Sequence, residues 1–299
     1  MPTPDLDAAA QFIAANARVL ERRRFDRLFR GGSADAVRDA VAAYRNDDGG
    51  FGHALEPDAR TPASQPLAVE TALRVLDEAD GWDEALVTPA LDWLEEVAPD
   101  QGGATFVLPN VDGWPHAPWW VPDEGLPPSL ISTGLIAATL LARATEHRWL
   151  DRASAWLWER IESFDGGHPY EVRAALAFLE HAPDRDRAHR AYETKIAPLL
   201  TRDDYVALDP KAPGEVHGPL DYAPRPGSPA RAAFDDATIA AHLDHLAAAQ
   251  RDDGGWTFNW LAWSPAAERE WRGAITVEAL KTLQTNALEG SDPFLRRRD

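Results

Sequence analysis

Gln250-Arg-Asp-Asp-Gly-Gly-Trp256 lies between two stretches of helical periodicity, and Asn46-Asp-Asp-Gly-Gly-Phe51 lies in the same context far upstream. Weaker copies are Asp100-Gln-Gly-Gly103 and Asp165-Gly-Gly167. Self-similarity of this kind is typical of one supersecondary unit copied along a chain. We expect each copy to end a helix, because Gly adopts the left-handed conformation that closes a helix C-terminus at little steric cost. The aromatic residue that follows is expected to pack back over that end.

Helical periodicity dominates the rest of the chain. Apolar residues recur at i, i+3, i+4 and i+7 in segments such as Val69–Leu76, and no alternating strand pattern is evident. No linker divides the sequence, so it predicts a single all-α domain over residues 1–299. The helices are predicted at roughly 6–28 (as one helix or two), 34–45, 66–79, 84–97, 129–145, 150–163, 170–181, 186–200, 235–250 and 273–287.

Composition excludes several classes of partner and site. The formal net charge of -19 argues against nucleic acid and anionic membranes as partners. The absence of cysteine excludes disulfides, thiolate catalysis and any zinc site with a Cys ligand. The N-terminus lacks the basic and apolar regions of a signal peptide, and the longest apolar run is too short to span a bilayer. We therefore expect a cytoplasmic protein without a transmembrane segment; the sequence does not predict an oligomeric state.

The Q-x-x-D-G-x-W pattern of Gln250–Trp256 resembles the QW repeat of the prenyltransferase and squalene-oxidase repeat superfamily. Members include class II terpene cyclases and the β subunits of protein prenyltransferases. The copy at Asp48-Gly-Gly-Phe51 has Arg45 in place of Gln and Phe in place of Trp. The resemblance implies an α/α toroid of about five helix pairs around a central cavity, and it favours an enzyme.

Two departures from the family limit what it implies about chemistry. Class II cyclases use an Asp-x-Asp-Asp motif as a proton donor, and none occurs here. The nearest match is Phe234-Asp235-Asp236, where Asp235 is more simply the N-cap of the next helix. The prenyltransferase zinc site needs a Cys, so no metal is predicted, and magnesium is expected only if the ligand is a diphosphate.

One candidate site follows the first Gly-Gly-aromatic copy. His53, Glu56, Asp58 and Arg60 lie on a loop that the toroid would place at the mouth of its cavity. There Glu56 and Asp58 are candidate acids, and His53 and Arg60 candidate ligand-binding groups. The alternative is structural: Glu56 or Asp58 caps the helix that follows and pairs with Arg60.

A second candidate site follows the last copy. The segment from Trp256 to Trp271 holds four tryptophans, among them Trp260 and Trp263. Aromatic walls stabilise carbocations, and the same rings stack on sugar faces, so aromatics alone do not separate the two chemistries. Glu270 and Arg272 are expected either as an ion pair or as a pocket acid and a binding residue on the loop before the last helix.

Two long loops complete the candidate set. Residues 100–128 contain Trp119 and Trp120, residues 201–234 contain Tyr222, and long loops in a compact domain tend to be lids or binding loops. We expect a terpenoid-cyclase-like or isoprenoid-binding protein with an aromatic-lined cavity and with Glu56, Asp58 or Glu270 as the acid. A carbohydrate-active lyase or glycosidase, and a non-catalytic binding scaffold, stay open as alternatives.

Overall fold

The computed structural model describes residues 3–287, which fall into two compact units. Unit 1 comprises the described residues up to Gly31 and from Ala197 onward, and unit 2 is Gly32–Ile196. Within the described range the chain forms twelve α-helices, and its only β-type pairings are isolated bridges. The predicted all-α class is confirmed. The single domain and the closed toroid stay predictions.

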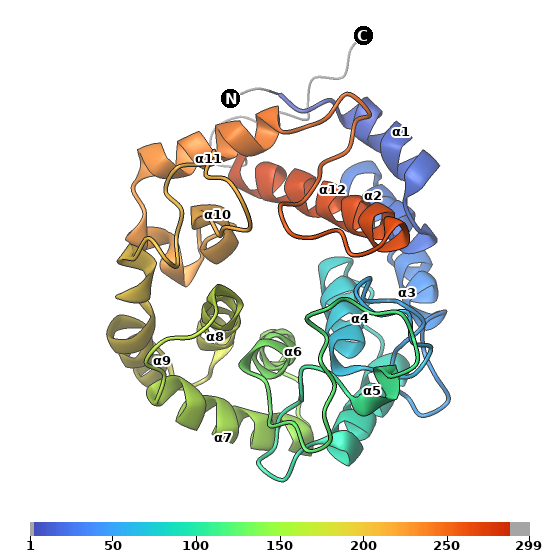
Figure 1. Cartoon of the computed structure of the whole chain (residues 1–299), viewed down its shortest axis with the longest axis vertical. Helices are drawn as coiled ribbons and strands as arrows, with labels where there is room; N and C mark the ends of the chain where they lie inside the picture. Colours follow the sequence, from blue (N-terminus) through green and yellow to red (C-terminus); the bar gives the residue numbers. More distant parts are fainter. Residues whose placement is uncertain (1–2, 288–299) are drawn as a thin grey trace. The chain divides into compact units, whose positions relative to one another are not determined.

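Unit 2 is built from two layers of helices. In Figure 1, α4, α6 and α8 form one layer, and α5, α7 and α9 form the other. Within and between these layers, α6 packs against α8, α4 and α7, while α5 packs against α4 and α7. The helices are α3 (Ala34–Ala42), α4 (Pro66–Glu78), α5 (Glu84–Val97), α6 (Leu130–Ala142), α7 (Arg148–Glu162), α8 (Pro169–His181) and α9 (Arg185–Ala191).

Helix α6 lies at the centre of unit 2, where it contacts α4, α7 and α8, and most of its residues are apolar and buried. Its contact with α8 is close: a Cβ added to Gly134 would lie 2.9 Å from the carbonyl oxygen of Ala174. Glycine at this position therefore permits the two helices to pack backbone to backbone.

Unit 1 is built around its last helix. There α12 packs against α1, α2 and α11, and α10 packs against α11. In Figure 1 these helices are the blue and orange-to-red ribbons at the two ends of the sequence. They are α1 (Leu6–Asn16), α2 (Val19–Arg30), α10 (Pro219–Tyr222), α11 (Asp236–Ala248) and α12 (Pro265–Ala287).

The two strongest sequence repeats form the same loop, one in each unit. In the first, the backbone N–H of Asn46 donates to the carbonyl of Gly50, and in the second that of Arg251 donates to the carbonyl of Gly255, both at 2.9 Å. The first glycine of each pair is left-handed, with φ of 92° at Gly49 and 89° at Gly254. The aromatic residues that follow, Phe51 and Trp256, are both 1% exposed. The expectation that each copy ends a helix at its glycine is wrong: α3 ends at Ala42 and α11 at Ala248, and the left-handed glycine lies in the loop that follows.

Each loop lies against a helix of its own unit at equivalent positions. Gly49 and Gly50 contact α5 at Pro89 and Trp93, four residues apart. Gly254 and Gly255 contact α1 at Ala8 and Phe12, also four residues apart. Residues i and i+4 lie on one face of a helix. Each loop therefore packs against a single face of its own helix, and the contacted residues have the same spacing in both units.

Most predicted helices agree with the structure, and two differ. The expected helix at 186–200 is interrupted: α9 ends at Ala191, and a π-helical stretch, Tyr192–Ile196, and a 3-10 turn, Leu199–Thr201, follow. The last helix begins at Pro265, well before the expected residue 273. Ser264 caps it by accepting from the backbone N–H of Ala267, and proline is favoured in the first helical turn.

Gly273 was expected to mark the start of that helix and instead lies inside it. A Cβ at this position would lie 3.0 Å from the Cβ of Ala17. The glycine therefore serves close packing of α12 against the end of α1. Consequently Glu270, Trp271 and Arg272 lie on a helix, and their prediction as loop residues is wrong.

Helix caps account for several of the remaining acids. The Oδ1 atom of Asp235 accepts from the backbone N–H of Thr238 at 2.7 Å, as expected for an N-cap. Asp48 and Asp253 accept from the backbone N–H of Gly50 and Gly255, so these acids hold the repeat loops.

Over residues 3–287, no helix combines the length and the apolar character that crossing a membrane requires.

Candidate functional site

The acidic loop after the first repeat is a tightly folded, buried turn in unit 2. Two of its non-glycine residues, His53 and Ala54, have left-handed φ angles of 56° and 60°. Glu56 is 9% exposed and Asp58 6% exposed, and the Oε2 atom of Glu56 accepts from the backbone N–H of Asp58 at 2.7 Å. Left-handed backbone at non-glycine residues is costly and tends to accumulate at functional sites, so this turn is the first candidate.

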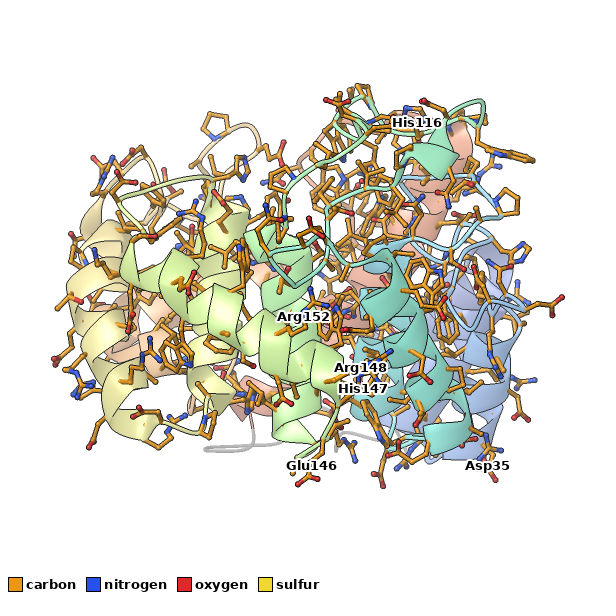
Figure 2. All side chains as sticks on the ribbon, turned by 90° about the horizontal axis from the view of Figure 1, so that it is seen from below. Asp35, His116, Glu146, His147, Arg148 and Arg152 are labelled. Carbon is orange, nitrogen blue, oxygen red and sulfur yellow. The ribbon has the colours of Figure 1, made fainter. Side chains whose placement is uncertain are left out.

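The tryptophan-rich loop of unit 2 covers this turn. Two backbone hydrogen bonds join them, from Ala117 N to Asp58 O at 2.7 Å and from Arg60 N to Pro115 O at 2.9 Å. The indole N–H of Trp119 donates to Oδ2 of Asp58 at 3.0 Å. Figure 2 places His116, on the covering loop, at the end of unit 2 opposite Asp35 and Glu146. Glu56, Asp58 and Trp119, which sequence reasoning assigned to separate segments, therefore form one site.

A small pocket lies within this site. It encloses about 170 Å³ of space between atoms, part of it open to solvent, and the fully accessible part holds about one water molecule. The residues that line it are Gly52, Ala54, Leu55, Glu56, Ala59, Thr61, Gln65, Ala68 and Trp120. The pocket therefore combines one carboxyl group, one indole and two uncharged polar side chains with apolar walls.

Gln65 fixes the pocket floor, and sequence reasoning missed it. Its Oε1 accepts from the backbone N–H of Leu108, while its Nε2 donates to the carbonyl of Leu108 and to the side chain of Asn110. It is also the residue before α4, and it provides no side-chain cap to that helix. In the sequence, the only signal for Gln65 was its place directly before Pro66. The structure also shows that neither Glu56 nor Asp58 is the N-cap of α4, so the capping part of that alternative is wrong.

The other two predicted residues of the loop flank the pocket without lining it. His53 is exposed, and its Nε2 atom lies 2.8 Å from Oδ1 of Asn46 in the repeat loop. Arg60 is half-buried and is joined to the covering loop by its backbone N–H. Both therefore connect the acidic turn to its neighbours in unit 2.

The aromatic stretch of unit 1 forms a second cluster. The ring of Trp260 stacks on that of Phe258 at 4.4 Å between centroids and meets the ring of Trp271 edge-on at 5.4 Å. All three rings are partly exposed, as is Glu270. This arrangement offers aromatic faces at a surface rather than a buried acid.

Arg272 has a structural partner in this second cluster. Its Nη2 atom lies 2.8 Å from both carboxylate oxygens of Asp253, its guanidinium lies 4.6 Å from the ring centroid of Phe12, and its Nε donates to the carbonyl of Trp256. Desolvation of Asp253 raises its pKa, but the bonds from Arg272 and from the N–H of Gly255 outweigh it, so the pKa lies below its ordinary value. Glu270, two residues away on α12, projects in a different direction from Arg272.

The remaining predicted binding residues lie in unit 1. Tyr222 is 3% exposed and donates its hydroxyl to the carbonyl of Tyr205 at 2.7 Å, which is a packing role. Trp263 is half-buried before α12. In the part of the chain that the structure describes, no group of three or more His, Asp or Glu side chains is arranged to hold a metal ion.

Comparison with known proteins supports the fold alone. No protein-family model matches the sequence. No curated protein matches it either. Among solved structures, a crystal structure of a protein from Actinoplanes is similar, with a TM-score of 0.54 and 16% sequence identity. The similarity covers 94% of this chain and 89% of that chain. At this level of identity the likeness shows a shared fold and carries no information on activity.

Proposed function

We propose that the protein is a terpene-cyclase-like enzyme that binds an isoprenoid chain and uses Glu56 as its acid. One observation carries the proposal: a buried carboxyl group lines a small pocket together with the ring of Trp120, and the carboxyl group of the neighbouring Asp58 is held by Trp119. The strained backbone at His53 and Ala54 supports it, because the fold maintains an unfavourable conformation at this turn.

The hydrogen bond to Glu56 suggests how the acid would act. The backbone N–H of Asp58 donates to Oε2 and orients the carboxyl group of Glu56. In the proposed step the O–H bond of the protonated carboxyl group breaks, a C–H bond forms at an alkene carbon, and the carboxylate keeps the electron pair. The neighbouring carbon becomes cationic, and the faces of Trp119 and Trp120 would stabilise that charge. Asp58 would act as a positioning residue, because it holds the indole of Trp119.

The aromatic cluster of unit 1 favours a second candidate function, action on a carbohydrate. The partly exposed, stacked rings of Phe258 and Trp260 resemble a platform for a sugar face, and Glu270 lies next to Trp271 in sequence. A glycosidase needs two carboxyl groups on opposite sides of a bond. This candidate therefore requires a second acid besides Glu270.

A thermal-shift panel separates these proposals. Purified protein would be heated with farnesyl and geranylgeranyl diphosphates, squalene, farnesol, and neutral and acidic oligosaccharides, each with and without magnesium. A ligand at 100 times its Kd stabilises the folded state by about 2.7 kcal/mol, which is easily measured as a shift in Tm. We expect stabilisation by isoprenoids. Stabilisation by a sugar alone supports the second candidate, and a flat response with every ligand contradicts both and leaves a binding scaffold.

Variants then locate the acid. With the stabilising isoprenoid as substrate and products detected by mass spectrometry, Glu56→Gln is expected to lower turnover at least about 100-fold, the usual contribution of a general acid. Glu270→Gln is the discriminating variant, because a loss there instead of at Glu56 moves the acid to unit 1. Glu124→Gln, an exposed acid in the covering loop of unit 2, is the matched control. Full turnover in Glu56→Gln contradicts the assignment.

A further inference from the structure

The indole N–H of Trp120 has no acceptor among the described residues. Trp120 is 1% exposed, and its Nε1 atom is buried without a hydrogen-bond partner. Other tryptophans differ: Nε1 of Trp119 donates to Asp58 at 3.0 Å, that of Trp149 to the carbonyl of Gly103 at 3.2 Å, and that of Trp256 to the carbonyl of Leu246 at 2.8 Å. Because a buried donor without an acceptor costs about 1–3 kcal/mol, this N–H indicates an acceptor that the chain itself does not supply.

The pocket that Trp120 lines limits the size of that acceptor. Its fully accessible part holds about one water molecule, so a single polar atom fits where a larger group does not. The two uncharged polar side chains in the wall are already engaged: Thr61 Oγ1 donates to the carbonyl of Asn110, and Gln65 bonds to the covering loop at both ends of its amide. The indole is therefore the donor that a small bound group would meet.

The charges around the pocket limit the acceptor further. Among the described residues that line it, none is Lys or Arg, and one is Glu56. A diphosphate would bring several negative charges beside the carboxyl group of Glu56, and burial of charge is costly. A neutral oxygen meets no such cost.

We infer that this pocket is a subsite for one uncharged oxygen of the ligand, a hydroxyl, ether or carbonyl oxygen, which accepts a hydrogen bond from Nε1 of Trp120. The inference rests on the proposed function for the rest of the ligand, and it narrows the substrate class from isoprenoids in general to neutral, oxygen-bearing ones. Trp120 is thus a binding residue for the oxygen-bearing end of the ligand.

The test compares ligands that share one carbon skeleton. Dissociation constants for farnesol, farnesal, the hydrocarbon farnesene and farnesyl diphosphate would be measured by calorimetry on the full-length protein. Farnesal is informative because its carbonyl oxygen accepts a hydrogen bond and donates none. We expect farnesol and farnesal to bind about 10-fold tighter than farnesene, the factor that 1.4 kcal/mol produces, and tighter than the diphosphate.

Trp120→Phe removes the donor and keeps an aromatic ring. In this variant the preference for the oxygenated ligands over farnesene is expected to fall to about one. Trp114→Phe is the matched control, because Trp114 lies on the same loop and is 47% exposed. It is expected to keep the full preference. If Trp120→Phe does not fold, the order of the four ligands on the unmodified protein decides the question.

The outcomes separate this inference from the proposed function. Equal affinity for farnesol and farnesene, tighter binding of the diphosphate, or an unchanged preference in Trp120→Phe each overturns the subsite while the isoprenoid proposal stands. Binding of farnesal that is no better than that of farnesene also overturns it. No binding of any isoprenoid to the unmodified protein overturns the proposed function itself.

Discussion

The repeat loops of the two units share a backbone and differ in what the chain builds after them. In both loops the carbonyl of the second glycine accepts from the backbone N–H four residues earlier, and both glycines contact one face of a helix. After Phe51 the chain forms a buried acidic turn under a covering loop, whereas after Trp256 it runs through a partly exposed aromatic stretch into α12. The repeat thus determines the position of a segment, and the residues after it determine whether that segment is a site.

The aspartates of the two repeat loops, Asp48 and Asp253, also differ in their side-chain partners. Asp48 accepts from the hydroxyl of Ser64, which is only 2% exposed, and Ser64 precedes the buried Gln65. Asp253 accepts from Arg272 at a position where its own side chain is 47% exposed. One repeat aspartate is therefore held by an uncharged hydroxyl and the other by a guanidinium, although both aspartates are exposed.

Among the variants that test the shared loop backbone, Gly254→Ala is expected to lose the most stability. A Cβ there would lie 2.2 Å from the carbonyl oxygen of Ala8, and the residue has a φ of 89°. Together, left-handed strain of about 1–2 kcal/mol and overpacking of about 1–3 kcal/mol predict a loss of about 3 kcal/mol or more. Gly49→Ala, with its clash at 2.6 Å from Pro89, should lose slightly less.

Urea unfolding measures both losses, and the chain provides a control in each unit. Gly31 and Gly113 also have positive φ angles, of 70° and 82°, but a Cβ at either would have no heavy atom within 4 Å. Their alanine variants should lose only about 1–2 kcal/mol from backbone strain. Equal losses at all four glycines would show that the contact with the helix contributes nothing, and would break the comparison.

The residue before each loop is expected to contribute a smaller amount to the free energy of unfolding, and the amount differs between the two loops. Gln250 accepts from the backbone N–H of Asp5 at 2.7 Å and donates to the carbonyls of Asp5 and Gly254 at 2.8 and 2.9 Å. Its counterpart Arg45 donates to the carbonyl of Ala85 at 3.4 Å. Gln250→Ala should therefore cost about 2 kcal/mol, and Arg45→Ala less than about 0.5 kcal/mol.

The same urea titrations check this difference, with Gln250→Glu as a further variant. Glu retains the acceptor for the Asp5 N–H, but it places an anionic oxygen against the carbonyls of Asp5 and Gly254, so it should cost at least as much as Gln250→Ala. A cost for Arg45→Ala as large as that for Gln250→Ala would contradict the view that the second copy is the more strongly braced one.

The fold class was predictable because its signals are local. A repeat of Asp-Gly-Gly with an aromatic residue specifies its own turn, and helical periodicity specifies the buried face of each helix. The predicted start of the last helix at 273 was wrong because Gly273 resembles a helix breaker, whereas tertiary contact with Ala17 gives it a packing role inside the helix. Local propensity cannot reveal a contact with a residue at the opposite end of the chain.

The site was predictable only in its parts. Glu56 and Asp58 were selected from their place after a repeat, and Trp119 and Trp120 from a long loop. What joins them is an isolated bridge between Ala59 and His116, a pairing with no signature in the sequence around either residue. Gln65 was missed for the same reason, since its partners lie on the covering loop. Non-local backbone pairing had to be seen before these residues could be recognised as one site.

The smallest expected effect on stability comes from the surface ion pair of Asp253 and Arg272. Desolvation raises the pKa of Asp253, and the bonds from Arg272 and Gly255 lower it by more, so its folded-state pKa lies below the unfolded value. The unfolded state therefore binds the proton more readily, and the stability that this carboxylate contributes is complete above the unfolded pKa of about 4 and is lost as the pH falls through the folded pKa. Because the side chain is 47% exposed, that contribution is expected to be below about 1 kcal/mol.

Asp253→Asn tests this sign directly. At pH 7 the variant should be slightly less stable to urea than the unmodified protein, and the two curves should converge as the pH falls below about 4. Asp252→Asn, at the exposed neighbouring position, controls for the loss of one negative charge. A gap for Asp253→Asn that stays constant across this range would mean that the charge of Asp253 contributes nothing and that the side chain matters only as a hydrogen-bond acceptor. The second loop would then be braced by the same kind of interaction as the first, where Asp48 accepts from Ser64.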